Sequence, residues 1–142
     1  MLTDFELLKT FSVSKQGEKI IKLVMFQGVT DVATNIRQAE LIDQAINNVL
    51  INDNKFNGLV DLSALGPAAH YPSPKARQIY SDLVNQERLE KIAVIAPQLI
   101  LRSIMRFIAT KTMTNKPIKF FKDYNTALNW LMDKNETFLQ IG

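Results

Sequence analysis

The sequence predicts an α/β fold: a mostly parallel sheet of four or five strands, an N-terminal hairpin and about four helices. After residue 58, three short apolar runs are each followed by turn residues and a helix-type stretch, and these runs are residues 58–63, 92–96 and 118–122. Strands that alternate with helices are typical of a parallel sheet with helices packed on it. The length of 142 residues indicates one domain over residues 1–142, since single domains commonly run to about 150 residues.

The first two strands are expected to form a hairpin. Residues 4–13 alternate loosely between apolar and polar side chains, and residues 19–27 are more continuously apolar. Gln16 and Gly17 offer a turn between them. Two such runs joined by a few residues are a hairpin signal.

The first long helix is predicted to begin at Thr30 or Asp31, either of which can cap it, and to run to about Ile51. Its apolar residues recur at intervals of three and four, as on one face of a helix. They are Val32, Ile36, Ala39, Ile42, Ala45, Ile46 and Val49.

The next helix is predicted to begin at Ser73 and Pro74, a serine cap followed by a proline in the first turn. A third helix is expected over about 98–113, after Pro97, and a last helix after Asp123 or Asn125. Residues 92–96 contain no polar side chain, which predicts a strand covered on both faces.

Asp61 interrupts the apolar run of the third predicted strand. The sequence leaves two interpretations open: the carboxylate is tied to a neighbouring backbone amide, or it is partly exposed at the end of the strand.

The composition restricts the class of protein. Hydrophobic residues make up 46% and charged residues 22% of the chain, as in ordinary soluble domains. The absence of cysteine excludes disulfides and thiolate chemistry. No apolar run approaches the roughly 18 residues that span a bilayer. Residues 1–6 carry acids where a signal peptide carries Lys or Arg, so a cytoplasmic location is expected.

Basic residues gather in the segment from Lys91 to Lys122, which contains seven of them and no acidic residue. Such a segment can mark a surface for anions, but seven charges over this length give a modest field. We favour the interpretation that these basic residues lie on a solvated helix face and on an edge strand that lysines protect from pairing with other chains. Nucleic-acid binding is not favoured, because exposed aromatic residues are not interleaved with these charges.

Four polar residues between positions 61 and 73 need separate consideration. Ser73 could accept a phosphate at a helix N-terminus, although a plain cap is preferred because Pro74 follows. His70 is the only histidine, so a zinc site is not expected. With Asp61 and Ser63 it could in principle form a catalytic set, but the chain has no Gly-x-Ser-x-Gly elbow. We therefore expect no enzyme activity.

Arg102 and Arg106 are four residues apart and so share a helix face. They could grip a phosphate or carboxylate, with Arg102 nearer the carboxyl edge of the sheet; two solvated arginines are the favoured alternative. No Gly-x-Gly phosphate loop is present, and no cofactor is expected.

A family resemblance rests on four short motifs in a fixed order. They are Asp61-Leu62-Ser63, the strand 91–95 with the helix that bears Arg102, Phe120-Phe121, and residues 127–131. In this order they resemble the STAS-like family, the domain of sulfate transporters and anti-sigma-factor antagonists, and specifically its small stand-alone bacterial members. The resemblance covers about residues 20–133.

The resemblance implies a sheet of four or five strands backed by four helices and a non-enzymatic binding role. In the regulatory members, a serine in an Asp-Ser-Ser-Gly or similar motif begins the helix after the third strand, and its phosphorylation switches partner binding. The equivalent stretch here, residues 69–74, has no Asp-Ser pair and no glycine. Only Ser73 could take the place of the switch serine.

Two functions follow as hypotheses. The leading one is a non-catalytic cytosolic regulatory module that acts through a protein partner, bound at the loop 64–73 and the start of the third helix, which is predicted over about 98–113. The alternative is a carrier or sensor of a small anionic or amphipathic, lipid-like ligand at the carboxyl edge of the sheet, with Arg102 on its head group. A carrier should enclose a pocket of roughly 300 Å³ or more.

Overall fold

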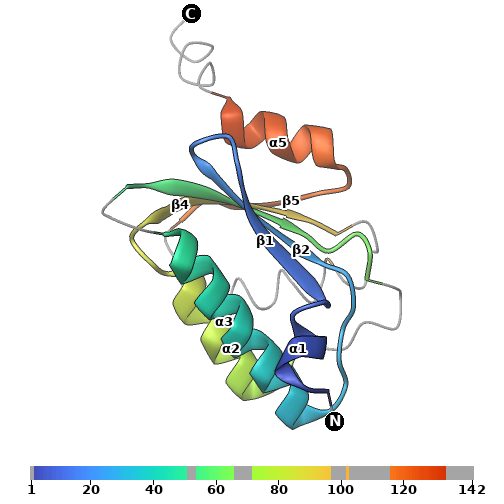
Figure 1. Ribbon diagram of the computed structural model, residues 1–142. Helices are drawn as coiled ribbons and strands as arrows, with labels where there is room; N and C mark the ends of the chain where they lie inside the picture. The colour runs from blue at the N-terminus through green and yellow to red at the C-terminus, as the bar shows by residue number, and fades with distance from the viewer. Residues whose placement is uncertain (1, 51–53, 66–71, 97–101, 103–115, 134–142) are drawn as a thin grey trace, which may run out of the picture.

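A computed structural model describes residues 2–50, 54–65, 72–96, 102 and 116–133. Five strands form one sheet in the order β1-β2-β3-β4-β5. The first pair is antiparallel and the other pairs are parallel (Figure 1). This confirms the predicted fold class and the N-terminal hairpin. The strands are β1 (Phe11–Gln16), β2 (Ile20–Met25), β3 (Phe56–Asp61), β4 (Leu89–Ile95) and β5 (Ile118–Phe121).

The helices cover both faces of the sheet. Figure 1 shows the two longest helices side by side on one face, which we call the α2–α3 face, and the last helix on the opposite face, which we call the α5 face. The helix predicted over 98–113 lies outside the described residues except for Arg102, which is helical. The helices are α1 (Asp4–Leu7), α2 (Val32–Val49), α3 (Pro74–Val84) and α5 (Tyr124–Met132).

The prediction of a strand over residues 4–13 was wrong for its first seven residues. Thr3 and Glu6 form a reciprocal cap, in which the Glu6 amide donates to Thr3 Oγ1 (3.2 Å) and the Thr3 amide donates to Glu6 Oε1 (2.9 Å). This cap satisfies two backbone donors locally and favours a helical turn. Leu7 is fully buried, and Arg37 on α2 holds Asp4 through two hydrogen bonds of 3.0 and 2.7 Å. The strand therefore begins only at Phe11.

The sequence left two possible capping residues open for the first long helix and two for the last one, and the structure shows which residue caps each. Asp31 caps α2 by accepting from the Thr34 amide (2.9 Å), and Asp123 caps α5 by accepting from the Thr126 amide (2.9 Å). Gly17 has a φ of 68° in the hairpin turn, a conformation that glycine adopts without a steric penalty.

The buried face of α2 differs from the predicted apolar stripe. Val32 is 61% exposed, whereas Gln38 is only 1% exposed. The stripe was placed on apolar residues alone, but Gln38 hydrogen-bonds inside the protein and so can occupy a buried position. The α2 helix ends at Val49, close to the expected Ile51.

Two separate cores flank the sheet, because successive residues of a strand point to opposite faces. On β4, Ile92 and Val94 belong to the larger core of the α2–α3 face, and Ala93 and Ile95 belong to the smaller core of the α5 face. All four are buried, which confirms the predicted burial of this strand on both sides. The smaller core also contains Ile20, Leu59, Ala127 and Leu131.

Candidate functional site

The carboxyl end of β3 holds two of the polar residues that the sequence singled out. Asp61 is the last residue of the strand. Its Oδ1 accepts hydrogen bonds from the Ser63 amide (2.9 Å) and the Ser63 hydroxyl (2.6 Å). Both interpretations of Asp61 therefore hold: the carboxylate binds a backbone amide, and it does so at the end of the strand. The result is a local turn of the kind that aspartate side chains stabilise, with Ser63 exposed on it.

Ser73 caps α3, as the sequence predicted. Its Oγ accepts from the Ala76 amide at 3.4 Å, and the Ser73 amide and hydroxyl both donate to Asn35 Oδ1, at 3.0 and 3.1 Å. Asn35 belongs to the first turns of α2. Ser73 thus ties the start of α3 to the start of α2 in addition to capping its own helix.

The other predicted site residues are described only in part. His70 and Arg106 lie outside the described residues. Arg102 is half-buried, and its Nε is buried without a hydrogen-bond partner in the part of the chain that the structure describes. Among those residues, no group of three or more His, Cys, Asp or Glu side chains could hold a metal ion. None of the described helices is long and apolar enough to cross a membrane.

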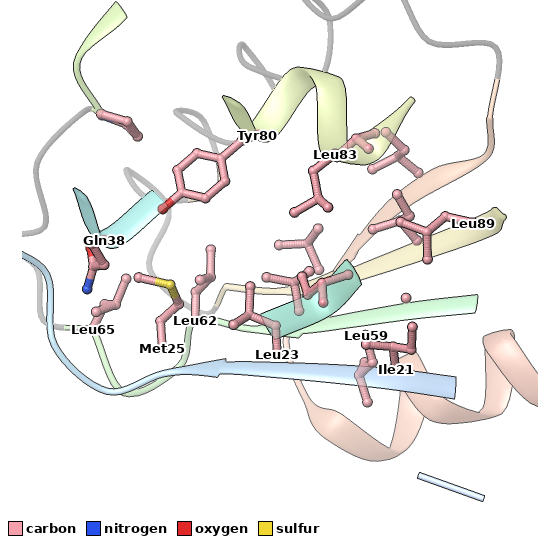
Figure 2. Close-up of a pocket in the computed structure, with 18 of the residues that line it drawn as sticks. Ile21, Leu23, Met25, Gln38, Leu59, Leu62, Leu65, Tyr80, Leu83 and Leu89 are labelled. Carbon is pink, nitrogen blue, oxygen red and sulfur yellow. The ribbon is translucent and has the colours of Figure 1, made fainter. Parts of the chain in front are cut away.

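A cavity of about 200 Å³ lies on the α2–α3 face, between the sheet and the two helices. Figure 2 shows aliphatic side chains from the strands, among them Ile21 and Leu23, facing Tyr80 and Leu83 of α3 across it. It is smaller than the roughly 300 Å³ expected of a site for a drug-sized ligand. Arg102 is not among the described residues that line it.

One end of the cavity is polar. Gln38, Asn35 and Tyr80 are the described lining residues that carry side-chain polar groups. The Gln38 Nε2 group donates to Thr10 Oγ1 (2.8 Å) and to the Gln27 carbonyl (3.1 Å). In Figure 2 the Tyr80 hydroxyl points toward the end where Gln38 lies. Burial raises the pKa of Tyr80 well above its ordinary value of 10.0, so the phenol remains protonated at neutral pH.

Apolar side chains that border unfilled space have fewer packing contacts on that side than fully enclosed ones. Sequence reasoning missed this cavity, because it arises where strands and helices far apart in the chain meet.

The described lysines of the basic segment mostly contact protein groups. The Nζ atoms of Lys91 and Lys119 lie 4.9 and 5.5 Å from the centroid of the Trp130 ring, and Lys116 donates to the Val84 carbonyl at 2.8 Å. Desolvation by burial lowers the pKa of Lys116. These contacts give Lys91, Lys116 and Lys119 a structural role, since a cation over an aromatic ring contributes to stability.

The fold now defines a class: a STAS-like α/β domain, with a mostly parallel sheet, an N-terminal hairpin and helices on both faces. The family model described as SpoIIAA-like matches residues 9–132. The chain therefore belongs to the SpoIIAA-like family, which confirms the resemblance noted in the sequence. Members of this family include anti-sigma-factor antagonists, which indicates a regulatory or binding role.

The chain is also similar to a solved structure, that of an uncharacterised protein of the DUF3478 family with a SpoIIAA-like fold, from Shewanella loihica PV-4. The two are 18% identical, the match covers 85% of this chain and 91% of that one, and the TM-score is 0.55. At this identity the likeness shows the fold alone. No curated protein matches the chain significantly.

Proposed function

We propose that this protein is a non-catalytic regulatory module that acts in the cytoplasm by binding a protein partner. The contact surface is the carboxyl end of β3 with the start of α3, around Ser63 and Ser73. Membership of the SpoIIAA-like family supports a binding role. Loops at the carboxyl edge of a parallel sheet are also the usual place for binding residues.

The observation that carries the proposal is the fixed geometry of this edge. Asp61 holds Ser63 in a turn, and Asn35 holds Ser73 at the start of α3. Polar groups that are held before binding lose less conformational entropy when a partner docks. Ser63 is exposed and can contact a partner without rearrangement of the strand.

The hydrogen bonds of the two serines favour binding over catalysis. A nucleophilic serine needs a base that is itself oriented by a third group. The Ser63 hydroxyl donates to Asp61, which also accepts from the Ser63 amide, and the Ser73 hydroxyl donates to the amide oxygen of Asn35. An amide oxygen does not act as a general base. For Ser73, these hydrogen bonds favour the role of a helix cap over the role of a phosphate acceptor.

The proposal is tested with two matched serine variants. Ser63 and Ser14 are both exposed, but Ser14 lies on the edge strand β1. A partner captured by the full-length protein from its native cells is identified, purified and titrated against the wild type, Ser63→Arg and Ser14→Arg. We expect Ser63→Arg to weaken binding at least about tenfold, as hot-spot substitutions do, and Ser14→Arg to leave it unchanged.

Thermal unfolding of both variants controls for loss of folding. Equal affinity of wild type and Ser63→Arg would contradict the proposed surface. Loss of binding in Ser14→Arg alone would place the interface on the hairpin instead.

A further inference from the structure

We propose that β1 pairs with β1 of a second copy of this chain, so that two copies form a dimer with one continuous sheet. The contact lies at the outer edge of β1, which is the first strand in the order β1-β2-β3-β4-β5. It is separate from the proposed partner surface at the carboxyl end of β3 and does not depend on it.

The backbone of β1 presents a row of donors and acceptors away from the sheet. In an antiparallel pair, only alternate residues hydrogen-bond to the neighbouring strand. The Phe26 amide donates to the Thr10 carbonyl (2.8 Å), and the register of β1 on β2 continues from this pair. The even-numbered residues of β1 therefore bond to β2, which is the only described strand that pairs with β1. The N–H and C=O groups of Phe11, Val13 and Lys15 face outward.

This edge lacks most of the features that keep strands of different chains apart. Proteins block open edges with lysines, prolines, bulges or very short strands. β1 has six residues in a regular register on β2 and contains no proline. The Nζ atom of its one lysine, Lys15, lies 5.7 Å from the centroid of the Phe56 ring on β3, so this side chain leans across β2 and away from the edge. By contrast, β5 at the other edge has four residues, one of them Lys119, and Lys122 follows it.

The sequence of β1 fits a second copy of itself. When two β1 strands run antiparallel about a twofold axis at Val13, Val13 lies opposite Val13 and Phe11 lies opposite Lys15. These are the residues whose backbone groups face outward, so each such pair can exchange hydrogen bonds. Ser12 lies opposite Ser14, and both are exposed. A register centred on Lys15 would place two lysines opposite each other, which is destabilising.

The twofold arrangement also limits the assembly to two copies. Each molecule uses its β1 edge once, and the contact is the same patch on both copies, so the pairing is closed. Pairing of β1 with β5 would instead continue from molecule to molecule, and the lysines of β5 oppose it.

Sedimentation equilibrium of the full-length protein alone, over a range of concentrations, tests the dimer. We expect the wild type to approach twice the 16.1 kDa mass of one chain as its concentration rises. Val13→Pro removes the central outward N–H from each copy, and proline is tolerated where the N–H of an edge strand faces solvent. It should weaken dimerisation at least about tenfold, because two hydrogen bonds are lost. Val13→Ala keeps the amide and should still dimerise.

Single cysteines locate the contact, since the chain has none of its own. The Cα atoms of a hydrogen-bonded antiparallel pair are about 5.5 Å apart, a separation that a disulfide spans. Val13→Cys should therefore give disulfide-linked dimers when copper phenanthroline is added as the oxidant. In the proposed register Ser14 lies about 7–8 Å from its counterpart, so Ser14→Cys should react far more slowly, as should Lys119→Cys on β5.

Three outcomes would overturn the inference. They are a wild type that keeps the mass of one chain at every concentration, a folded Val13→Pro that dimerises as tightly as the wild type, and disulfide formation in Ser14→Cys or Lys119→Cys as fast as in Val13→Cys. Circular dichroism shows whether Val13→Pro is folded, and if it is not, the cysteine variants still decide the question. None of these results bears on the partner surface, because no partner is present.

Discussion

The two faces of the sheet are packed in different ways. On the α5 face, the nine-residue helix α5 lies against a small core in which Ala93 and Ala127 are both 0% exposed. Small side chains allow a helix to approach a sheet closely. On the α2–α3 face, two longer helices cover a larger core and leave a cavity of about 200 Å³. The same strands therefore carry a small core with two fully buried alanines on one face and a larger core beside a cavity on the other.

The largest expected effect compares two isoleucines on opposite faces. Ile95 on β4 packs in the α5 core, and Ile21 on β2 lines the cavity; both are at least 97% buried. We expect Ile95→Ala to lower the free energy of unfolding by about 4 kcal/mol and Ile21→Ala by about 2 kcal/mol, within the range for such truncations. A side chain beside a cavity has fewer contacts to lose. Urea unfolding measures both, and equal costs would contradict the difference in packing.

A second comparison changes the sign of the effect. Ala93→Val adds two methyl groups at a residue that is 0% exposed in the α5 core, and we expect the overpacking to destabilise the protein by about 2 kcal/mol. Val60→Leu extends a side chain into the cavity and should stabilise the protein by about 1 kcal/mol. Thermal unfolding of the two variants gives the signs. A destabilised Val60→Leu would indicate that the cavity cannot accept even one additional methylene group.

The smallest effect concerns the helix caps of the two faces at low pH. The hydroxyl and amide of Thr34 hold the pKa of Asp31 below 3.8, and the amide and hydroxyl of Thr126 do the same for Asp123. A carboxyl whose pKa is lower in the folded state stabilises the fold above its unfolded pKa. That contribution is lost as the pH falls through the folded value.

Asp31→Asn and Asp123→Asn keep a capping oxygen but remove this dependence. We expect each variant to be less stable than the wild type at neutral pH and to approach the wild type as the pH falls below 3.8, the ordinary pKa of the carboxyl. Urea unfolding across this range measures the difference. A difference that stayed constant down to the lowest pH would contradict the assignment of the pKa shifts to these caps.

Local patterns in the sequence predict most of the fold. Ser73 before Pro74, Asp31 and Asp123 are capping residues whose effect depends on their immediate neighbours, and the unbroken apolar run of β4 requires cover on both sides. The α1 helix was missed because its cap, Thr3 with Glu6, competes with a weak alternation over the same residues. The hydrogen bonds of this cap stabilise a helical turn at residues 4–7 instead of a strand.

The candidate site was only partly predictable. The places of Ser63 and Ser73 follow from the order of strands and helices, but the bond from Ser73 to Asn35 joins residues 38 positions apart and leaves no local signal. The cavity depends on how side chains from β2, β3, β4 and α3 fit together. The one local hint was Gln38, a polar residue beside the apolar positions of α2 that proves almost fully buried.

The strand order has a consequence for synthesis of the chain. From β2 to β5, each described strand pairs with the strand that precedes it in the sequence. The partner of each strand has therefore already been synthesised when that strand leaves the ribosome. Domains begin to fold from the N-terminus during translation, and short sequence separation between contacting segments favours fast folding. The hairpin of β1 and β2 can therefore form first and serve as the template on which each later strand is added.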